Sequence, residues 1–471
     1  MATATLPSDT IAGLAALIRR RQVSPVEITR MVLDRIAAVD RRLNSFITVC
    51  ADEAIQAARA AASEIARGRY RGPLHGVPVS VKDLMAMRGH RLTGGSKILA
   101  DHVPDFDATV VARLREAGTV IVGKTNLHEF AYGVTNNNVH YGPVRNPWDT
   151  SRIPGGSSGG SAVAVAAGLG AGTLGSDTGG SVRIPAALCG LVGLKVTYGR
   201  VSRHGVLPLS WSLDTVGPLA WTAEDAAILL RAIAGADPRD PSSSDAPVPD
   251  YQGGLRGGIR GLRVGRPRQY MFDLVDSEVA AAVEEAIGVL RSLGAEVEEV
   301  STPWLDDAIS AAAAIVHAEA AAYHLAWLRT RPQDYGDEVR ERLLVGTSLP
   351  AVAYVQAQRT RSLLIAQMEV VWRAVDVLVA PTTPAPAARI GDATVPVNGR
   401  EMDVRTTFIR CTYPVNFLGL PSISVPCGFT RAGLPVAFQI IGRPFAEDVL
   451  LRAAHAYQQQ TDWHVRRPPL A

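Results

Sequence analysis

The chain has 471 residues, 47% of them hydrophobic and 20% charged, and its 48 basic residues nearly balance its 45 acidic ones to leave a net charge of +3. This balance gives no support to a nucleic-acid-binding surface, and no apolar run reaches the roughly 18 residues needed to span a bilayer. The N-terminal basic cluster follows a short apolar run, which is the reverse of a secretory signal, so we expect a cytoplasmic protein.

The N-terminal part of the chain predicts helices around an α/β core. A helix begins at Ser24-Pro25-Val26-Glu27, where a capping serine precedes a proline and an acidic residue, and an alanine-rich helix covers 51–68. The run VPVSVKDL at 77–84 predicts a strand that enters a turn, and 107–125 predicts a helix followed by the apolar strand 119–122. This alternation indicates α/β architecture.

The stretch 154–190, PGGSSGGSAVAVAAGLGAGTLGSDTGGSVRIPAALCG, is the most informative part of the chain. Two serine clusters, Ser157-Ser158 and Ser181, follow glycines and flank a predicted helix at 161–167. Glycine lets the backbone approach a substrate closely, and successive N–H groups in such turns can bind an oxyanion. The pattern predicts a hydrolytic active site with a serine nucleophile.

The second half of the chain returns to the same alternation. It predicts strands at 262–264, 296–300, 376–379, 422–425 and 437–441, a helix at 277–293, and alanine-rich helices to about Trp372. We therefore expect a single domain over 1–471, made of a helical N-terminal wrap (1–70), a catalytic core (71–235), an exposed connection rich in Pro, Ser and Gly (236–261), and a C-terminal half that completes the sheet and the substrate pocket (262–471).

Three other motifs match known patterns in the wrong structural context. The GxxxxGK[ST] match at 118–125 contains a strand where a phosphate-binding loop is required, and the GxGxxG match at 170–175 follows a helix instead of a strand. The GxSxG match at 155–159 would require a Ser, acid, His order. No downstream histidine has a distinctive setting, and we expect His317 and His324, seven apart on a predicted helix, to be packed residues.

A serine nucleophile needs a general base, and Lys82 is the candidate. It ends the alternating apolar run Val77, Val79, Val81, where a structural lysine is unusual. Burial would disfavour its charged form and lower its pKa, which makes the amine a base. The alternative is an ion pair between Lys82 and Asp83 at a strand end.

Together, the segments 77–84 and 154–190 resemble the amidase signature family of Ser-Ser-Lys hydrolases. The resemblance extends through GKTNLHEFAYG, GPVRNPWD, GLVGLKVTYGRVSRHG and NFLGLPSISVPCG, and Ser157 and Ser181 are 24 residues apart, as the family requires. It implies the amidase signature fold, a central mixed twisted β-sheet covered on both faces by α-helices.

The resemblance also implies a role for each residue of the site. Lys82 is the base, Ser157 relays the proton, and Ser181 is the nucleophile that forms the acyl-enzyme. The peptide bond between Gly156 and Ser157 is expected to be cis. The backbone N–H groups of Thr178, Gly179, Gly180 and Ser181 would form the oxyanion hole. Neither a metal nor an organic cofactor is required.

Neighbouring residues are expected to support this site. Asp177 and Arg183 flank the nucleophile and would hold its loop by hydrogen bonds and an ion pair, whereas Ser158 and Ser161 would support Ser157 or cap the helix. Four aromatic residues are candidate walls of an apolar substrate pocket: Phe130, Tyr132, Phe408 and Phe417.

The expected function is an amidohydrolase that cleaves C–N bonds of carboxylic amides, with aryl amides and anilides first and carbamates and esters as further candidates. The alternative within the resemblance is the glutaminase component of glutamyl-tRNA(Gln) amidotransferase, its A subunit, which works with partner subunits. That component carries an acid shortly before its NLAGLP-type motif to hold the ammonium of glutamine. The comparable segment here, 408–416, has no acid and instead contains Ile409 and Tyr413, which counts against glutaminase activity.

The expected partners follow from charge and composition. We expect a small-molecule amide as substrate, no nucleic acid, no membrane, and no protein partner beyond a second copy of the chain in a homodimer. Four widely spaced cysteines predict buried, reduced thiols without a metal site: Cys50, Cys189, Cys411 and Cys427.

Overall fold

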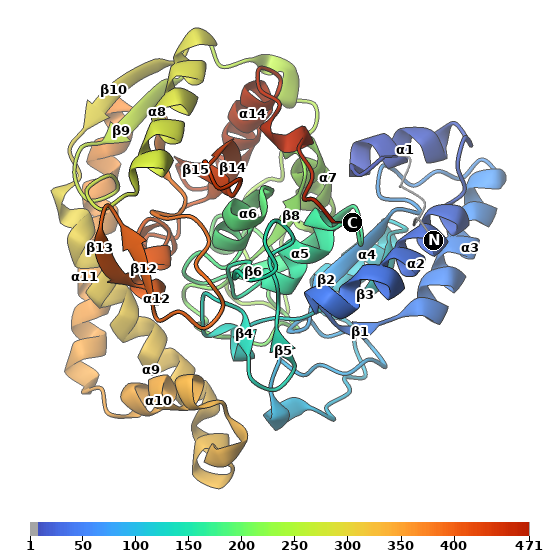
Figure 1. Cartoon of the computed structure of the whole chain (residues 1–471), viewed down its shortest axis with the longest axis horizontal. Coiled ribbons are helices and arrows are strands. Elements are labelled where there is room, and N and C mark those ends of the chain that lie inside the picture. The colour runs from blue at the N-terminus through green and yellow to red at the C-terminus, as the bar shows by residue number, and fades with distance from the viewer. Residues whose placement is uncertain (1–7, 471) are drawn as a thin grey trace.

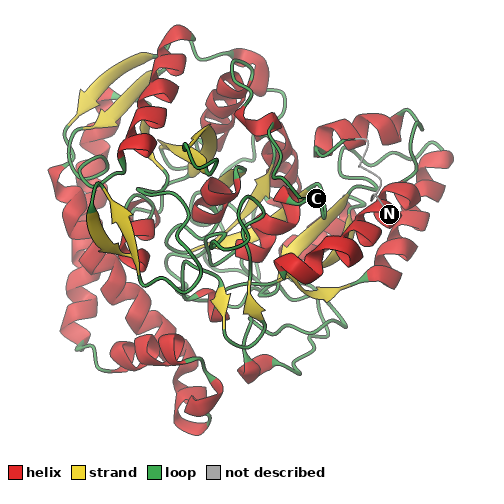
Figure 2. Cartoon of the chain, viewed as in Figure 1, coloured by secondary structure: helices red, strands yellow, loops and turns green. Residues whose placement is uncertain are grey.

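A mixed β-sheet runs through the protein and is flanked by helices (Figures 1 and 2). The computed structural model describes residues 8–470, and within that range eleven strands form one sheet in the order β1-β3-β2-β6-β8-β7-β14-β15-β11-β9-β10. The expected α/β fold with a mixed sheet is thus confirmed. The strands are β1 (Phe46–Val49), β2 (Pro78–Lys82), β3 (Val120–Thr125), β6 (Gly172–Asp177), β7 (Val192–Lys195), β8 (Thr215–Ala220), β9 (Arg263–Pro267), β10 (Glu296–Val300), β11 (Val377–Pro381), β14 (Ser422–Phe429) and β15 (Pro435–Gly442).

The sheet is mixed because its two ends contain parallel pairs and its centre is antiparallel. Strand β2 runs parallel to both β3 and β6, and β9 runs parallel to β10 and β11. Between them, β8, β7, β14 and β15 pair in antiparallel fashion. The central strands β6, β7, β8 and β15 are buried along their whole length, which explains why their sequences are largely apolar or small.

Helix α2 begins where its local signals place it. Ser24 caps α2 and Glu27 bonds back to the backbone of Ser24, with Pro25 at the first helical position. In Figure 1, α1 to α3 lie together at one side of the molecule. The helices are α1 (Ile11–Arg19), α2 (Pro25–Leu43), α3 (Ala51–Ala66), α4 (Thr109–Glu116), α5 (Gly159–Ala166), α6 (Arg183–Cys189), α7 (Ala223–Ile233), α8 (Ser277–Ser292), α9 (Asp307–Thr330), α10 (Asp337–Thr347), α11 (Ala351–Ala374), α12 (Val404–Ile409), α13 (Tyr413–Phe417) and α14 (Glu447–Gln458).

Two further expectations concern membranes and cysteines. Among the described residues, no helix has the length and apolar character needed to cross a membrane. The four cysteines are unpaired and buried, as expected.

The connection 236–261 is irregular, as its composition suggests, but parts of it are fixed to the body of the protein. Asp237 is buried and accepts hydrogen bonds from Ser202 and Thr109, and the side chain of Tyr251 is also buried. Because a polar anchor of this kind depends on groups far away in the chain, turn-forming composition alone could not predict it.

The residues that match the phosphate-binding motif form a strand and a buried ion pair. Gly123, Lys124 and Thr125 belong to β3, and the Lys124 Nζ lies 2.6 Å from Asp83 Oδ1, with both side chains fully buried. Burial lowers the pKa of Lys124 and raises that of Asp83, and the attraction between the two charges opposes both shifts. Asp83 is therefore the partner of Lys124, and the predicted alternative pairing of Asp83 with Lys82 is wrong.

This pair predicts a large loss of stability when only one partner is removed. Lys124→Met should lower the free energy of unfolding by about 3–5 kcal/mol, because it leaves the Asp83 carboxylate buried without its counter-charge. The matched control, Arg340→Met, breaks the exposed Arg340–Asp337 pair of α10 and should cost about 1 kcal/mol or less. Urea titrations of the three proteins measure the difference, and equal losses in the two variants would contradict the buried-pair argument.

Candidate active site

The site is built around the amine of Lys82, which is the last residue of β2 and is fully buried. Three serine hydroxyls surround its Nζ: Ser157 Oγ at 2.7 Å, Ser158 Oγ at 2.9 Å and Ser176 Oγ at 3.0 Å. The first two serines precede α5 and the third lies in β6, which runs parallel to β2. The structure thus brings together three segments that are up to 94 residues apart in the chain.

The environment of Lys82 favours the neutral amine. Burial lowers the pKa of Lys82 well below its ordinary value of 10.5, and the charges of Asp177 and Asp214 oppose this shift. Among the described residues, no carboxylate forms an ion pair with Lys82. A neutral amine in contact with serine hydroxyls can accept a proton, so this geometry suits a general base.

Ser157 is held in place by its backbone. The Gly156–Ser157 peptide bond is cis, which agrees with the conformation that the resemblance implied. The carbonyl of Ser157 accepts a hydrogen bond from the backbone N–H of His128 at 3.1 Å. Ser158 was expected only as a support, and its side chain contacts both Lys82 and the Ser176 carbonyl. Ser176 was not predicted, although its position one residue before Asp177 at the end of a strand was a usable signal.

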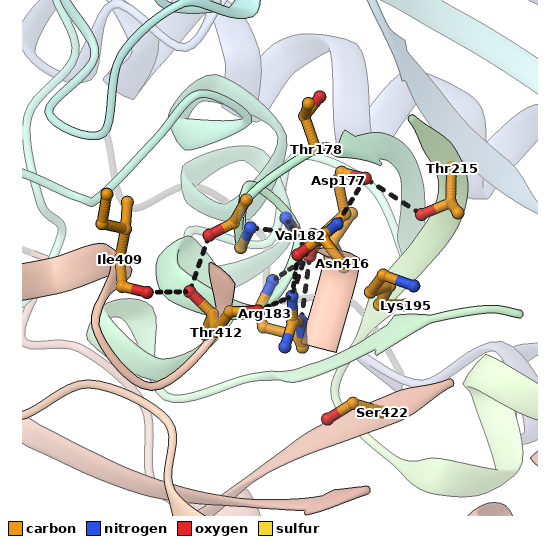
Figure 3. Close-up of polar contacts among 12 residues, drawn as sticks. Asp177, Thr178, Val182, Arg183, Lys195, Thr215, Ile409, Thr412, Asn416 and Ser422 are labelled. Atoms are coloured by element: carbon orange, nitrogen blue, oxygen red, sulfur yellow. Dashed lines mark hydrogen bonds and ion pairs between the residues drawn. The ribbon is translucent and has the colours of Figure 1, made fainter. Parts of the chain in front are cut away.

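Asp177 organises the loop that carries Ser181, and Figure 3 shows its contacts with Val182, Arg183 and Asn416. Its carboxylate accepts hydrogen bonds from the backbone N–H groups of Gly180 at 2.8 Å and Val182 at 3.1 Å, and it pairs with Arg183 at 3.1 Å. Burial alone would raise the pKa of Asp177, but the charge and hydrogen bonds of Arg183 outweigh it and lower the pKa to about 2. Asp177 is therefore ionised, and its charge fixes the turn around Ser181.

Arg183 extends this network to the C-terminal half of the chain. Fully buried, it donates to Asn416 Oδ1 at 2.5 Å, to Gln439 Oε1 at 3.0 Å and to the Thr412 carbonyl at 3.0 Å. The predicted roles of Asp177 and Arg183 in holding the loop thus agree with their contacts, while Asn416 and Gln439 were not predicted as members of the network.

The expected oxyanion hole needs one change. The N–H of Gly180 donates to Asp177, so it is not free to bind an oxyanion with the amides of Thr178, Gly179 and Ser181. Gly180 has a φ of +126°, and a Cβ there would lie 2.2 Å from Thr412 Oγ1. Glycine is therefore required at position 180 for the shape of the turn, because any side chain would collide with the residue that precedes α13.

A small cavity of about 40 Å³ lies beside Ser181. Of the four predicted aromatic walls only Tyr132 lines it. Phe408 and Phe417 are fully buried elsewhere in the core, and Phe130 packs against His324 with ring centroids 4.4 Å apart. The cavity is lined by Ala131, Tyr132, Gly133, Val134, Thr178, Gly179, Ser181, Leu209, Val316, Arg405, Ile409 and Tyr413.

Phenylalanine thus proved a poor guide to the pocket, because a large apolar ring gains more free energy in the core than at a wall, whereas Tyr132 and Tyr413 both line it. Arg405 was missed altogether. The available signal was its position four residues before Ile409, since residues four apart lie on the same face of a helix. A second cavity of about 520 Å³ reaches Ser176 and shares Ala131, Thr178 and Leu209 with the first, so the two cavities adjoin at these residues.

Comparisons with known proteins agree with this site. A family model described as Amidase matches residues 27–451. The A subunit of glutamyl-tRNA(Gln) amidotransferase from Moorella thermoacetica is 44% identical over 482 residues, which cover 97% of each chain. Its counterpart from Thermotoga maritima has a solved structure that is 37% identical, with a TM-score of 0.79 over 93% of this chain and 92% of that one.

Another solved structure is more similar in shape. It belongs to a protein complex described as revealing the evolutionary origins of an s-triazine catabolic enzyme, and it is 37% identical with a TM-score of 0.93 over 96% of this chain and 98% of that one.

These relatives correct the expected partners. Several matched proteins are subunits of an enzyme named for a tRNA, and one matched structure is a protein complex. The prediction of no nucleic acid and of no protein partner beyond a second copy of the chain is therefore wrong. Net charge could not settle this point, because it sums over the whole surface and carries no information about a local interface or a shared complex.

The geometry of Lys82 predicts a pH-dependent activity. Lys82→Ala should lower kcat by about 10²-fold or more, because the serine hydroxyls lose their base. In the unaltered enzyme kcat/KM should fall as the pH drops through the lowered pKa of Lys82, since the protonated ammonium cannot accept a proton. The exposed Lys97→Ala variant is the matched control and should behave like the unaltered enzyme.

Lys195 complicates that profile and supplies a second control. Burial lowers its pKa to about 7, so it too can change charge near neutral pH. The fall of kcat/KM at low pH, the acidic limb of the profile, should persist in Lys195→Met if it is caused by protonation of Lys82. A limb that disappears in Lys195→Met, or near-normal turnover in Lys82→Ala, would contradict the assignment.

The position of Ser181 predicts where a covalent inhibitor attaches. A serine-directed fluorophosphonate should modify Ser181, and peptide mass spectrometry should find the adduct on its peptide and not on that of Ser157. Ser181→Ala should abolish both labelling and amide hydrolysis. An adduct on Ser157 together with full activity of Ser181→Ala would refute the assignment.

Proposed function

The chain belongs to the Amidase family and is an enzyme that hydrolyses amide C–N bonds, and we propose that it acts as the amide-hydrolysing component of an amidotransferase-type complex. The observation that carries the catalytic part is the buried Lys82 amine at 2.7 Å from Ser157 Oγ. The partner part is supported by full-length similarity to amidotransferase A subunits, with 97% of each chain covered. This proposal replaces the stand-alone aryl amidase that the segment 408–416, without an acid, favoured.

The proposed mechanism uses Lys82, Ser157 and Ser181 in sequence. Neutral Lys82 takes the proton of Ser157 while Ser157 takes the proton of Ser181, and Ser181 Oγ attacks the carbonyl carbon. The N–H groups of Thr178, Gly179 and Ser181 bind the negative oxygen of the tetrahedral intermediate. The C–N bond then breaks as Ser157 gives a proton to the leaving nitrogen and regains one from Lys82, which returns to its neutral form. Water repeats the cycle on the acyl-enzyme and releases the acid.

The dimensions of the site favour a short acyl group. A cavity of about 40 Å³ has room for about three water molecules, at roughly 10–15 Å³ each. An aromatic acyl group would need the walls formed by Tyr132, Ile409 and Tyr413 to move. A short amide that releases ammonia fits the cavity without such movement.

The proposal predicts that activity depends on a protein partner. The chain, tagged in its source organism and isolated with its bound partner proteins, should release ammonia from a primary amide about fivefold faster or more than the chain alone, a ratio typical of coupled sites. The same complex prepared with Ser181→Ala should assemble normally and release none. Isolation of the chain without any partner protein, with full activity toward an acyl anilide, would contradict the proposal.

A further inference from the structure

An arginine without an ion-pair partner among the described residues lies in the wall of the cavity beside Ser181. Arg405 belongs to α12, and with Ile409, one turn later, it forms the part of the wall contributed by that helix. The helix is fixed at its start, because the side chain of Asp403 accepts a hydrogen bond from the backbone N–H of Thr406 at 2.8 Å. The position of Arg405 in the wall is therefore set by a capped helix end.

Arg405 carries the only formal charge among the described residues that line this cavity. Within residues 8–470 no carboxylate lies within ion-pair distance of it, and its side chain is half-buried. The neighbouring Arg342 differs, because it pairs with Glu338 and donates to the Tyr132 carbonyl. The balance of charge at the cavity is therefore positive.

The other polar groups nearby do not cancel this charge. Burial raises the pKa of Tyr132 to about 12, with Arg405 acting in the opposite direction, so its phenol is neutral. The Tyr132 hydroxyl lies 2.6 Å from His317 Nδ1, and burial together with Arg405 lowers the pKa of His317. Tyr413 is likewise a neutral phenol, because burial raises its pKa. An anion that enters the cavity meets one cation and, from the described lining residues, no competing negative charge.

We propose that Arg405 binds a carboxylate of the substrate, so that the amide cleaved at Ser181 belongs to a short acid carrying a second, free carboxylate. This inference rests on the proposed function, in which Ser181 attacks the amide. A guanidinium that is partly removed from water gains a charge-assisted, often bidentate, hydrogen bond when a carboxylate arrives. The small volume of the cavity keeps the acid short.

The same wall provides no counter-charge for a substrate ammonium. Ile409 is apolar and buried, and none of the described lining residues is acidic. A substrate with an ammonium next to its carboxylate would place that positive charge near Arg405 without a counter-charge. The cavity therefore favours a simple dicarboxylic monoamide over an α-amino acid amide such as glutamine.

Matched amides test the proposal directly. Malonamate, succinamate and glutaramate are compared with propanamide, butanamide and pentanamide, in which a methyl group replaces the carboxylate. At least one carboxylate of the series should have a kcat/KM for ammonia release about 10- to 100-fold above its methyl partner. Glutamine, which adds only the α-ammonium to glutaramate, should be the poorer member of that pair. Equal kcat/KM values within all three pairs would overturn the proposal.

Variants at the cavity assign the preference to Arg405. Arg405→Ala should reduce the ratio between the best carboxylate and its methyl partner to about 1, and Arg405→Lys should retain part of it. Arg400→Ala removes an exposed arginine from the preceding strand β13 (Arg400–Asp403) and should leave the ratio unchanged. Ile409→Asp should move the preference from glutaramate toward glutamine. An unchanged ratio in Arg405→Ala would overturn the assignment.

A binding measurement separates this inference from the proposed function. Isothermal titration of full-length Ser181→Ala with the preferred carboxylate and its methyl partner needs no turnover. If Ser181→Ala binds the carboxylate more tightly than its methyl partner, and Ser181→Ala/Arg405→Ala does not, the inference is supported. If the unaltered protein nevertheless hydrolyses no amide, only the proposed function fails. Equal binding of the two ligands together with normal ammonia release would overturn the inference and leave the proposed function standing.

Discussion

The burial of the Lys82 amine away from every described carboxylate is the constraint on which the site depends. A lysine paired with an acid would remain an ammonium and could not accept a proton from serine. Three nearby acids are each committed elsewhere: Asp83 to Lys124, Asp177 to Arg183, and Asp214 to the hydroxyl of Thr178 at 2.6 Å. Lys82 is left with serine hydroxyls, which accept or donate without imposing a charge.

The pairing of these acids also explains why the catalytic region needs the whole chain. Asp177 and Arg183 hold the turn around Ser181 from within the glycine-rich stretch, and Asn416 bonds to Arg183 from the C-terminal half (Figure 3). Gln439, from the same half, completes the bonding of Arg183. A buried guanidinium with unmet hydrogen bonds would be costly, so the strands and helices that supply its acceptors stabilise the nucleophile loop as well. Catalytic geometry and folding are therefore coupled through one polar cluster.

The cavity next to this cluster links the chemistry to the choice of substrate. In our proposal its volume limits the acyl group, its wall provides no counter-charge for an ammonium, and Arg405 attracts an anion. The relatives include amidotransferase A subunits at 44% identity, yet the wall that would hold glutamine's ammonium lacks an acid among the described residues. Similarity to the A subunits and a cavity wall without an acid are compatible, because substrate preference depends on a few wall residues and the fold depends on many core residues.

The sequence by itself determined the features that depend on short-range patterns. The alternation of apolar runs predicted the α/β sheet, the Ser24 to Glu27 cap predicted the start of α2, and the resemblance carried by the glycine- and serine-rich motifs implied the candidate triad of Lys82, Ser157 and Ser181. Only the tertiary structure decided which groups meet across the chain. It paired Asp83 with Lys124, added Ser176 beside Lys82, turned the Gly180 N–H toward Asp177, buried Phe408 and Phe417 in the core, and placed Arg405 in the cavity wall. Most of these contacts join segments that are distant in sequence, and their partners are selected by packing and charge in the folded state, which local propensity does not encode.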